Sequence, residues 1–373
     1  MPILRRSVAA SLKRLLSVLP LFATLFLALA GCSDSSPAAA PPKAAQQAEE
    51  LPPPSPVPAT TPAPTPTAAV GVMPGNLLIA DRANNRVIEV TPDREIVWEF
   101  PRPGDLQPGQ RFRWPDDAFY APDGKSIVIN EEEAHAIVLV DYASRRIVWQ
   151  YGVSEHHGSA RGYLNGPDDA YMWPDGSLGV ADIRNCRIIL IERDTKTIRR
   201  QLGRTGVCAH TPPKTFGLPN GDTPLANGHV LITEILGAWV SEIGWDGTLY
   251  WTTRAPGIHY PSDAQMLPDG NILLVDYARP GQILIMTRQG QPVWRYGPRS
   301  GAGMLDHPSL AIALGNGDIA LNDDFRNRVI VIDPTTNKIV WQYGVDDRRG
   351  RTGGLLFIPD GIDLKPANWG NPS

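Results

Sequence analysis

Several features typical of common enzyme classes are missing from this 373-residue chain. It has only three cysteines and seven histidines, and it contains no G-x-S-x-G, H-E-x-x-H or P-loop motif. The usual sequence evidence for a serine hydrolase, a zinc peptidase or a nucleotide-binding enzyme is therefore lacking. Basic side chains are also fewer than acidic ones, since the chain beyond residue 32 has 31 basic and 39 acidic side chains. This balance excludes a protein that binds nucleic acid through the phosphate backbone.

Glycine and proline are abundant instead. The chain has 35 glycines and 37 prolines, well above the share of about 12% that these residues take in average proteins. Each of them interrupts a helix, so the excess argues against a mainly helical protein. Short strands joined by turns are the favoured alternative.

The N-terminus has the pattern of a secretion signal. Four basic residues within the first 14 precede an apolar run over residues 15–30, which is about 24 Å long as a helix and short for a membrane span. The run ends in Leu29-Ala30-Gly31-Cys32, which resembles the lipobox of bacterial lipoproteins. The resemblance implies that residues 1–31 are removed and that Cys32 is diacylated (a palmitate-type anchor) and tethers the protein to a membrane. An ordinary signal peptide with a chance cysteine is the alternative.

Ser33 rather than aspartate follows this cysteine. In bacteria with two membranes, the resemblance then implies an outer-membrane lipoprotein, on the periplasmic or the surface side. Residues 32–72 hold eleven prolines and almost no large apolar side chain, so we expect an extended, disordered tether. The folded domain is predicted to cover residues 73–373.

That domain contains a sixfold repeat. Prolines recur at intervals of 42 to 52 residues, each followed by a polar residue, then a turn and a β-branched strand; they are Pro115, Pro167, Pro219, Pro261, Pro308 and Pro359. Each unit reads as four strands and predicts an all-β, six-bladed β-propeller of four-stranded blades. The chain opens with a blade that lacks its first strand and ends with a lone first strand at residues 359–364. We therefore expect the C-terminal strand to pair with the N-terminal blade and close the ring.

Two further positions repeat along the chain. A short acidic or amide side chain follows the second strand of each unit, at Asp81, Asn130, Asp182, Glu234, Asp276 and Asp323. We interpret these residues as turn formers that accept backbone N–H bonds. The fourth strands carry Trp98, Trp149, Trp251, Trp294 and Trp341, which we expect to pack between neighbouring sheets.

The repeat also carries a family resemblance. Residues 81–87 and 323–329 resemble the NHL repeat, and residues 147–152 and 339–344 are similar to blade ends of arylsulfotransferase-type and quinoprotein-type propellers. The resemblance covers about 300 residues and implies a six-bladed, NHL-like propeller lipoprotein. It specifies the fold well and the chemistry poorly.

The two remaining cysteines fall on one face of this predicted ring. Loops between blades share a face, here called the top face, with the turns between second and third strands. Cys186 follows such a turn and Cys208 lies in the next connector, so we expect a disulfide, with a pair of free buried thiols as the alternative.

Acidic residues gather at the predicted channel mouth on the same face. Asp117, Asp169 and Asp263 stand two positions past their prolines, and Asp116, Asp168 and Asp360 stand one position past theirs. Calcium or another divalent cation at Asp117, Asp169 and Asp263 is one hypothesis; strand ends capped by solvated side chains are the alternative. Strand alternation predicts that positions one and two past a proline do not both face the channel.

Most histidines also fall in top-face loops. His259 and His307 directly precede two blades, and they are the candidate catalytic residues for proton transfer or nucleophilic chemistry.

Two classes of function remain open. The first is a membrane-tethered, extracytoplasmic binding or scaffold module that uses its top face to hold a protein, glycan or small molecule. The second is an enzyme at the channel mouth. Similar propellers imply a divalent-metal-dependent hydrolase or lyase of the lactonase or esterase type, or an arylsulfotransferase-like transferase.

Overall fold

The computed structural model describes residues 71–370. The predicted signal peptide, Cys32 and almost all of the predicted tether lie outside the described residues. Between residues 71 and 370, no helix is both long and apolar enough to cross a bilayer.

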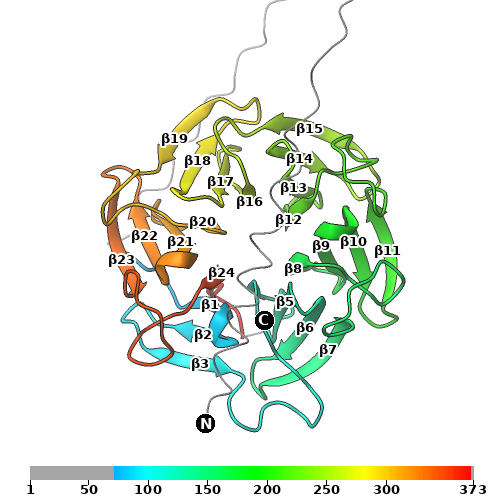
Figure 1. The fold of residues 1–373 in the computed structure, drawn as a ribbon, viewed down its shortest axis with the longest axis horizontal. Coiled ribbons are helices and arrows are strands. Elements are labelled where there is room, and N and C mark those ends of the chain that lie inside the picture. The colour runs from blue at the N-terminus through cyan, green and yellow to red at the C-terminus, as the bar shows by residue number, and fades with distance from the viewer. Residues whose placement is uncertain (1–70, 371–373) are drawn as a thin grey trace, which may run out of the picture. The chain divides into compact units, whose positions relative to one another are not determined.

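Within this range, strands form six four-stranded antiparallel sheets, or blades, arranged in a ring (Figure 1). Blade 1 contains β24 (Pro359–Leu364), β1 (Leu77–Asp81), β2 (Arg86–Val90) and β3 (Ile96–Phe100). Blade 2 contains β4 (Ala118–Tyr120), β5 (Ser126–Glu131), β6 (Ala136–Asp141) and β7 (Arg146–Gly152). Blade 3 contains β8 (Pro167–Met172), β9 (Leu178–Asp182), β10 (Arg187–Glu192) and β11 (Thr197–Leu202).

Blades 4 to 6 continue in chain order. Blade 4 contains β12 (Pro219–Pro224), β13 (Val230–Glu234), β14 (Trp239–Ile243) and β15 (Leu249–Arg254). Blade 5 contains β16 (Pro261–Met266), β17 (Ile272–Asp276), β18 (Gln282–Met286) and β19 (Pro292–Tyr296). Blade 6 contains β20 (Ala311–Ala313), β21 (Ile319–Asp323), β22 (Arg328–Asp333) and β23 (Lys338–Gly344). Three 3-10 helices stand between second and third strands: η1 (Arg82–Asn84), η2 (Ile183–Asn185) and η3 (Asp324–Arg326).

The C-terminal strand closes the ring, as predicted. β24 pairs antiparallel with β1, with Leu364 opposite Leu77 and Ile362 opposite Ile79. The prediction of an all-β, six-bladed β-propeller closed by its last strand is confirmed. Closure matters because an unpaired β1 would expose backbone N–H and C=O groups along an open edge.

The hydrophobic core is divided among the interfaces between neighbouring blades. Six buried clusters are each built mainly from two adjacent sheets; for example, one joins Leu77 and Ile79 of blade 1 to Val329 and Val331 of blade 6. Each blade is therefore covered on both faces only when both neighbours are present.

The repeated tryptophans link neighbouring blades. The indole N–H of Trp98 donates to the carbonyl of Tyr142 at 2.9 Å, and that of Trp149 donates to Arg193 at 2.8 Å. Trp294 and Trp341 make the same contact with the next blade, to Pro334 at 3.1 Å and to Pro92 at 2.9 Å. At four interfaces the indole thus combines packing with one directed bond, whereas Trp251 donates to Glu242 of its own blade at 2.7 Å.

The repeated acids accept backbone N–H bonds from the incoming connector, as predicted. Asp81 accepts from Phe357 at 2.8 Å, and Asp182 accepts from Asn165 at 2.7 Å. The corresponding bonds reach Glu234, Asp276 and Asp323.

The prediction for blade 2 is wrong by one residue. There Glu131 accepts the N–H of Arg113, whereas Asn130 accepts that of Asp117 at 3.2 Å. The extra residue Lys125 in the preceding turn shifts the register of this strand by one position.

The predicted disulfide is present between Cys186 and Cys208, with Cα atoms 5.2 Å apart. Cys186 is fully buried beside η2, and Cys208 lies in the connector between blades 3 and 4. The bond therefore ties the long connector to the top of blade 3.

Replacing both cysteines by serine should lower the free energy of unfolding by about 3 kcal/mol, because the cross-link restricts a 22-residue loop in the unfolded chain. Denaturant unfolding measured with and without reductant tests this. Reductant should lower the stability of the wild type and leave the Cys186→Ser/Cys208→Ser variant unchanged; equal stability of both oxidised proteins would contradict it.

The acidic channel mouth as candidate functional site

Successive residues at the start of several inner strands both reach the channel because these strands are bulged. In β8, Pro167 is opposite Asp182 and Ala170 is opposite Val180, so three steps on one strand match two on the other. The same register shift occurs in β12, β16 and β24. The prediction that positions one and two past the proline point to different sides is therefore wrong, because a bulge interrupts strand alternation.

Two rings of side chains result. The upper ring holds the residues one position past each proline: Asp116, Asp168, Asn220, Ser262, Ser309 and Asp360. The lower ring holds those two positions past: Asp117, Asp169, Gly221, Asp263, Leu310 and Gly361. We refer to the six carboxylates of the two rings as the acidic well; its members are Asp116, Asp117, Asp168, Asp169, Asp263 and Asp360.

The three predicted metal ligands are neighbours in the lower ring, and all three are at most 8% exposed. Repulsion among Asp117, Asp169 and Asp263 contributes to the raised pKa values of Asp117 and Asp169. Within residues 71–370, the three carboxylates whose oxygens all lie within 4.8 Å of one another are instead Asp116, Asp117 and Asp168. The Oδ2 atom of Asp169 is buried and accepts no hydrogen bond from any described residue. An acceptor of this kind indicates room for a proton or a cation.

Glycines make space for these carboxylates. A Cβ atom on Gly361 would lie 2.7 Å from the Cα atom of Asp117, and one on Gly221 would lie 3.0 Å from Oδ1 of Asp263. Larger residues at the two positions would displace the acids of the neighbouring blades, so the two glycines of the lower ring have a steric cause.

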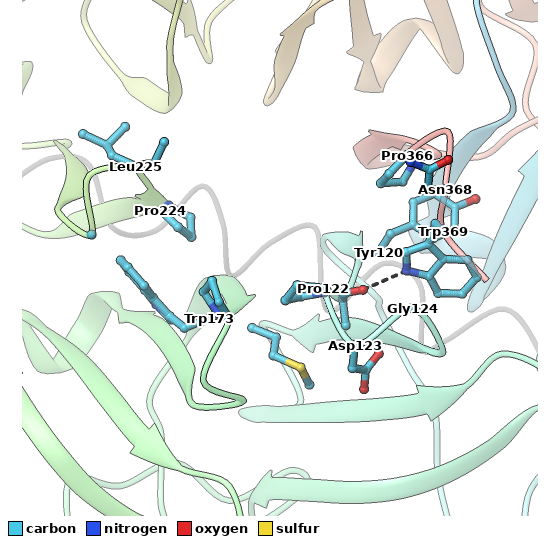
Figure 2. Close-up of a pocket in the computed structure, with 15 residues that line it drawn as sticks. Tyr120, Pro122, Asp123, Gly124, Trp173, Pro224, Leu225, Pro366, Asn368 and Trp369 are labelled. Atoms are coloured by element: carbon cyan, nitrogen blue, oxygen red, sulfur yellow. Dashed lines mark hydrogen bonds between the residues drawn. The ribbon is translucent and has the colours of Figure 1, made fainter. Parts of the chain in front are cut away.

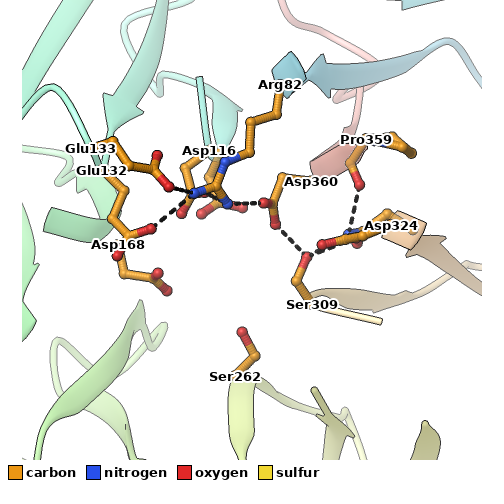
Figure 3. A network of polar contacts seen from close by, with 12 residues as sticks. Arg82, Asp116, Glu132, Glu133, Asp168, Ser262, Ser309, Asp324, Pro359 and Asp360 are labelled. Carbon is orange, nitrogen blue, oxygen red and sulfur yellow. Dashed lines mark hydrogen bonds and ion pairs between the residues drawn. The ribbon is translucent and has the colours of Figure 1, made fainter. Parts of the chain in front are cut away.

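Arg82 is the cation that the chain itself supplies to the well (Figure 3). Its guanidinium pairs with Asp116, Asp360 and Glu133 and lies 3.0 Å from Glu132. The upper ring continues this network, since Asp360 accepts from Ser309 at 2.6 Å and Asp168 accepts from Asn220 at 2.5 Å. Polar contacts thus run around much of the channel mouth.

One guanidinium does not neutralise so many acids. Burial, followed by repulsion from Asp360 and Asp263, raises the pKa of Asp117 well above its ordinary value, and burial with repulsion from Asp263 and Asp117 does the same to the pKa of Asp169. Burial raises the pKa of Asp263 to about 6. The well therefore favours protons or added cations over bare negative charge.

Sequence reasoning missed Arg82, although a signal was available. The position after each repeated acid carries Arg82, Glu132, Ile183, Ile235, Tyr277 and Asp324 in the six blades. The residue type at this repeated top-face position differs from blade to blade. The charged residues Arg82, Glu132 and Asp324 therefore do not serve the repeated fold and indicate a role at the channel mouth. The acidic run at residues 131–133 is also largely buried, since Glu131 is 1% exposed and the side chain of Glu132 is 16% exposed.

The two candidate catalytic histidines lie away from this network. The imidazole of His259 is 83% exposed and is 3.4 Å from Asp276, the acid that holds its connector. The imidazole of His307 bonds Asp306 at 2.6 Å and packs edge-on against Tyr277 and Phe325. Within residues 71–370, the polar contacts of the two imidazoles are with Asp276 and Asp306 and not with the acidic well.

The opposite face of the ring contains a cavity of about 1040 Å³. It is lined by turns between first and second strands of blades 2 to 4 and by the C-terminal residues, with Trp173 and Trp369 on different sides (Figure 2). The N–H of Trp369 donates to the carbonyl of Ala121 at 2.8 Å, which fixes the C-terminal segment beside blade 2.

The top face carries six of the exposed large apolar side chains, and a similar number lie on the outer strands. Trp114 (41% exposed) and Tyr163 (37%) lie in connectors, and Phe325 (46%) lies in η3. Val153, Leu236 and Val345 are also exposed in top-face loops. Exposed aromatic residues are enriched at protein contact surfaces.

The fold and the site define the chain as a six-bladed β-propeller with an acidic channel mouth. The sequence of residues 190–355, less than half of the chain, matches the family described as outer membrane protein assembly factor BamB. A search of curated proteins finds no match.

Solved structures confirm the fold. A protein of unknown function from Bacteroides caccae is 17% identical and superposes with a TM-score of 0.54, covering 77% of this chain and 97% of that chain. A chain of the nidogen/laminin complex is 15% identical, with a TM-score of 0.50 and the same two coverages. At these identities the likeness concerns the propeller alone.

Glu131→Gln tests the electrostatic cost of burying an acid next to the site. Burial raises the pKa of Glu131 from 4.5 to about 8, so between these values the native state keeps a proton that the unfolded state has lost. The stability of the wild type should fall across this window as pH rises, while glutamine stays neutral and keeps an acceptor for the N–H of Arg113.

The free energy of unfolding of the variant should therefore rise relative to that of the wild type by up to about 1.4 kcal/mol per pH unit between about pH 5 and pH 8. Denaturant unfolding at several pH values measures the difference. Asp194→Asn, at a side chain that is 84% exposed, is the matched control. A pH-independent difference for Glu131→Gln would contradict the expectation.

Proposed function

We propose that this chain is a lipid-tethered extracytoplasmic propeller that binds a partner through its top face and does not itself turn over a substrate. The observation that carries this proposal is the set of three exposed aromatic side chains on top-face segments of different blades, Trp114, Tyr163 and Phe325. Aromatic residues commonly provide most of the binding energy at protein interfaces. A ring of rigid blades holds these loops in fixed positions, which lowers the entropic cost of binding.

The arrangement of the channel mouth supports binding over catalysis. Arg82 occupies part of the mouth through its carboxylate contacts, and His259 and His307 contact Asp276 and Asp306 at the rim. A nucleophile or general base must lie within hydrogen-bonding reach of the reacting group. The family description of an outer membrane protein assembly factor, which matches residues 190–355, is consistent with a scaffolding role in the cell envelope.

A divalent-metal-dependent hydrolase or lyase is the second candidate, and one observation favours it. The acidic well offers several carboxylate oxygens as ligands where the inner strands face the channel. One of them is the buried Oδ2 of Asp169, which has no hydrogen-bond partner among the described residues. A metal there would polarise a carbonyl group. Hydrolysis of lactone and ester substrates that requires added calcium would support this candidate.

Site-specific photo-crosslinking in the native cell envelope tests the binding face. A photoreactive residue at position 114, 163 or 325 should give one discrete adduct, and the Trp114→Ala change should weaken the adduct formed from position 163. Position 148 is the matched control, because Val148 is 59% exposed but lies on the outer strand β7. Equal labelling from position 148, or no adduct from the top face, would contradict the proposal.

The tether is tested separately at Cys32. Growth with labelled palmitate should label the wild-type protein, and Cys32→Ser should abolish the label and release the propeller from the membrane fraction. Cys186→Ser/Cys208→Ser is the control and should keep the label. A labelled Cys32→Ser protein would exclude the lipid anchor at this position.

A further inference from the structure

We infer that the top face takes a protein partner with an acidic contact surface, and that exposed arginines in the loops around the channel mouth bind its carboxylates. The inference rests on the proposed binding function and adds the chemistry of the partner. The arginines concerned lie in the connectors between blades and in the turns between second and third strands, outside the acidic well.

Exposed charge is unevenly divided between the two faces of the ring. Within residues 71–370, the connectors and second-to-third-strand turns of the top face expose twelve basic and three acidic side chains. The turns of the opposite face expose four basic and six acidic side chains. The whole chain has a net charge of −4. The excess of positive charge is therefore a local property of the top-face loops and does not follow from the composition.

Most of these basic side chains are not neutralised by the chain itself. Five of the twelve form ion pairs, as Arg279 does with Asp306 at 2.9 Å and Arg351 with Glu99 at 2.8 Å. The other seven, such as Arg204, pair with no carboxylate of the described residues. Their charge is available to carboxylates on a partner, which would form charge-assisted hydrogen bonds with them.

The type of basic residue favours a contact surface. Eleven of the twelve side chains are arginines, and the remaining one is Lys214; the other four described lysines lie outside these loops. The guanidinium is planar, binds a carboxylate through two parallel hydrogen bonds and is less strongly hydrated than an ammonium group. Protein interfaces are accordingly enriched in arginine and depleted of lysine.

Exposed aromatic side chains accompany the arginines and indicate the class of partner. Arg113 directly precedes Trp114, and Arg161 lies two residues before Tyr163. Aromatic anchors combined with surrounding arginines are typical of protein interfaces. A polyanion that binds through phosphate groups needs no apolar anchor, and across the ring it would face the carboxylates of the acidic well. The observations therefore favour an acidic protein surface.

The acidic well limits where the partner's carboxylates can lie. Arg82 is already paired with Asp116 and Asp360 at the mouth, so it offers little charge to a partner. The six carboxylates of the well repel further negative charge, whereas the loops around them attract it. A partner must therefore place its acids over the loops, and this pattern of charge fixes its orientation on the face.

Reversing exposed charges on the top face tests the inference in the native cell envelope. The Arg204→Glu/Arg299→Glu/Arg348→Glu variant changes three exposed side chains that form no ion pair with a described residue, so we expect the fold to be kept. The yield of the photo-crosslinked adducts from positions 114, 163 and 325 should fall by about tenfold, because three attractive contacts become repulsive.

The matched control reverses the same number of charges on the opposite face. Lys125→Glu/Lys196→Glu/Arg288→Glu changes three exposed basic residues there and should keep the adducts. Adducts that survive the top-face reversal, or that the control weakens equally, would overturn the acidic partner and leave the binding function intact. No adduct from the wild type at any of the three positions would overturn both.

A defined probe separates a protein surface from other anions. A labelled peptide of glutamate and leucine should bind the full-length protein in detergent, with an affinity that falls as salt is added; a lysine and leucine peptide should not bind. The top-face variant should bind the glutamate peptide about tenfold more weakly than the wild type. Equal binding of both peptides, or binding only to mixed micelles that contain phosphatidylglycerol, would rule out an acidic protein partner.

Discussion

The whole structure depends on the pairing of β24 with β1. Each blade has two apolar faces, and its core clusters are shared with the blades on either side. A row of such sheets leaves an uncovered face at each end, whereas a closed ring leaves none. Pairing the last strand with the first blade closes the ring within a sheet, so opening it requires breaking backbone hydrogen bonds as well as separating apolar surfaces.

Closure has an electrostatic consequence at the channel. Every inner strand begins at the same end of the ring, so whatever polar residue follows the repeated proline is brought to one mouth. The bulges in β8, β12, β16 and β24 double this effect by turning two successive residues inward. Six carboxylates then share a poorly solvated space, and Arg82 on a neighbouring turn supplies one compensating charge.

This combination separates two roles on one face. The well is small, charged and buried, and suits an ion or protons; the loops around it carry Trp114, Tyr163 and Phe325 in contact with solvent and suit a larger partner. The rigid inner strands hold the well, while the connectors vary from blade to blade. A propeller can therefore keep its fold constant and change its ligands through these loops.

The regular features of the protein followed from the sequence by itself. The spacing of six prolines, the missing first strand of blade 1 and the repeated acids and tryptophans determined the number of blades, the closure and the loop face on which Cys186 and Cys208 meet. These predictions succeeded because repeated local interactions, such as Asp81 with the backbone of Phe357, need only the right residue at the right interval.

Tertiary structure alone decided what the irregular residues do. The bulges that turn Asp168 and Asp169 to one side, the register shift from Asn130 to Glu131 and the reach of Arg82 across to Asp116 depend on how neighbouring blades meet. A sequence pattern records position along one strand, and it does not record the distance between side chains that different blades bring to a common axis.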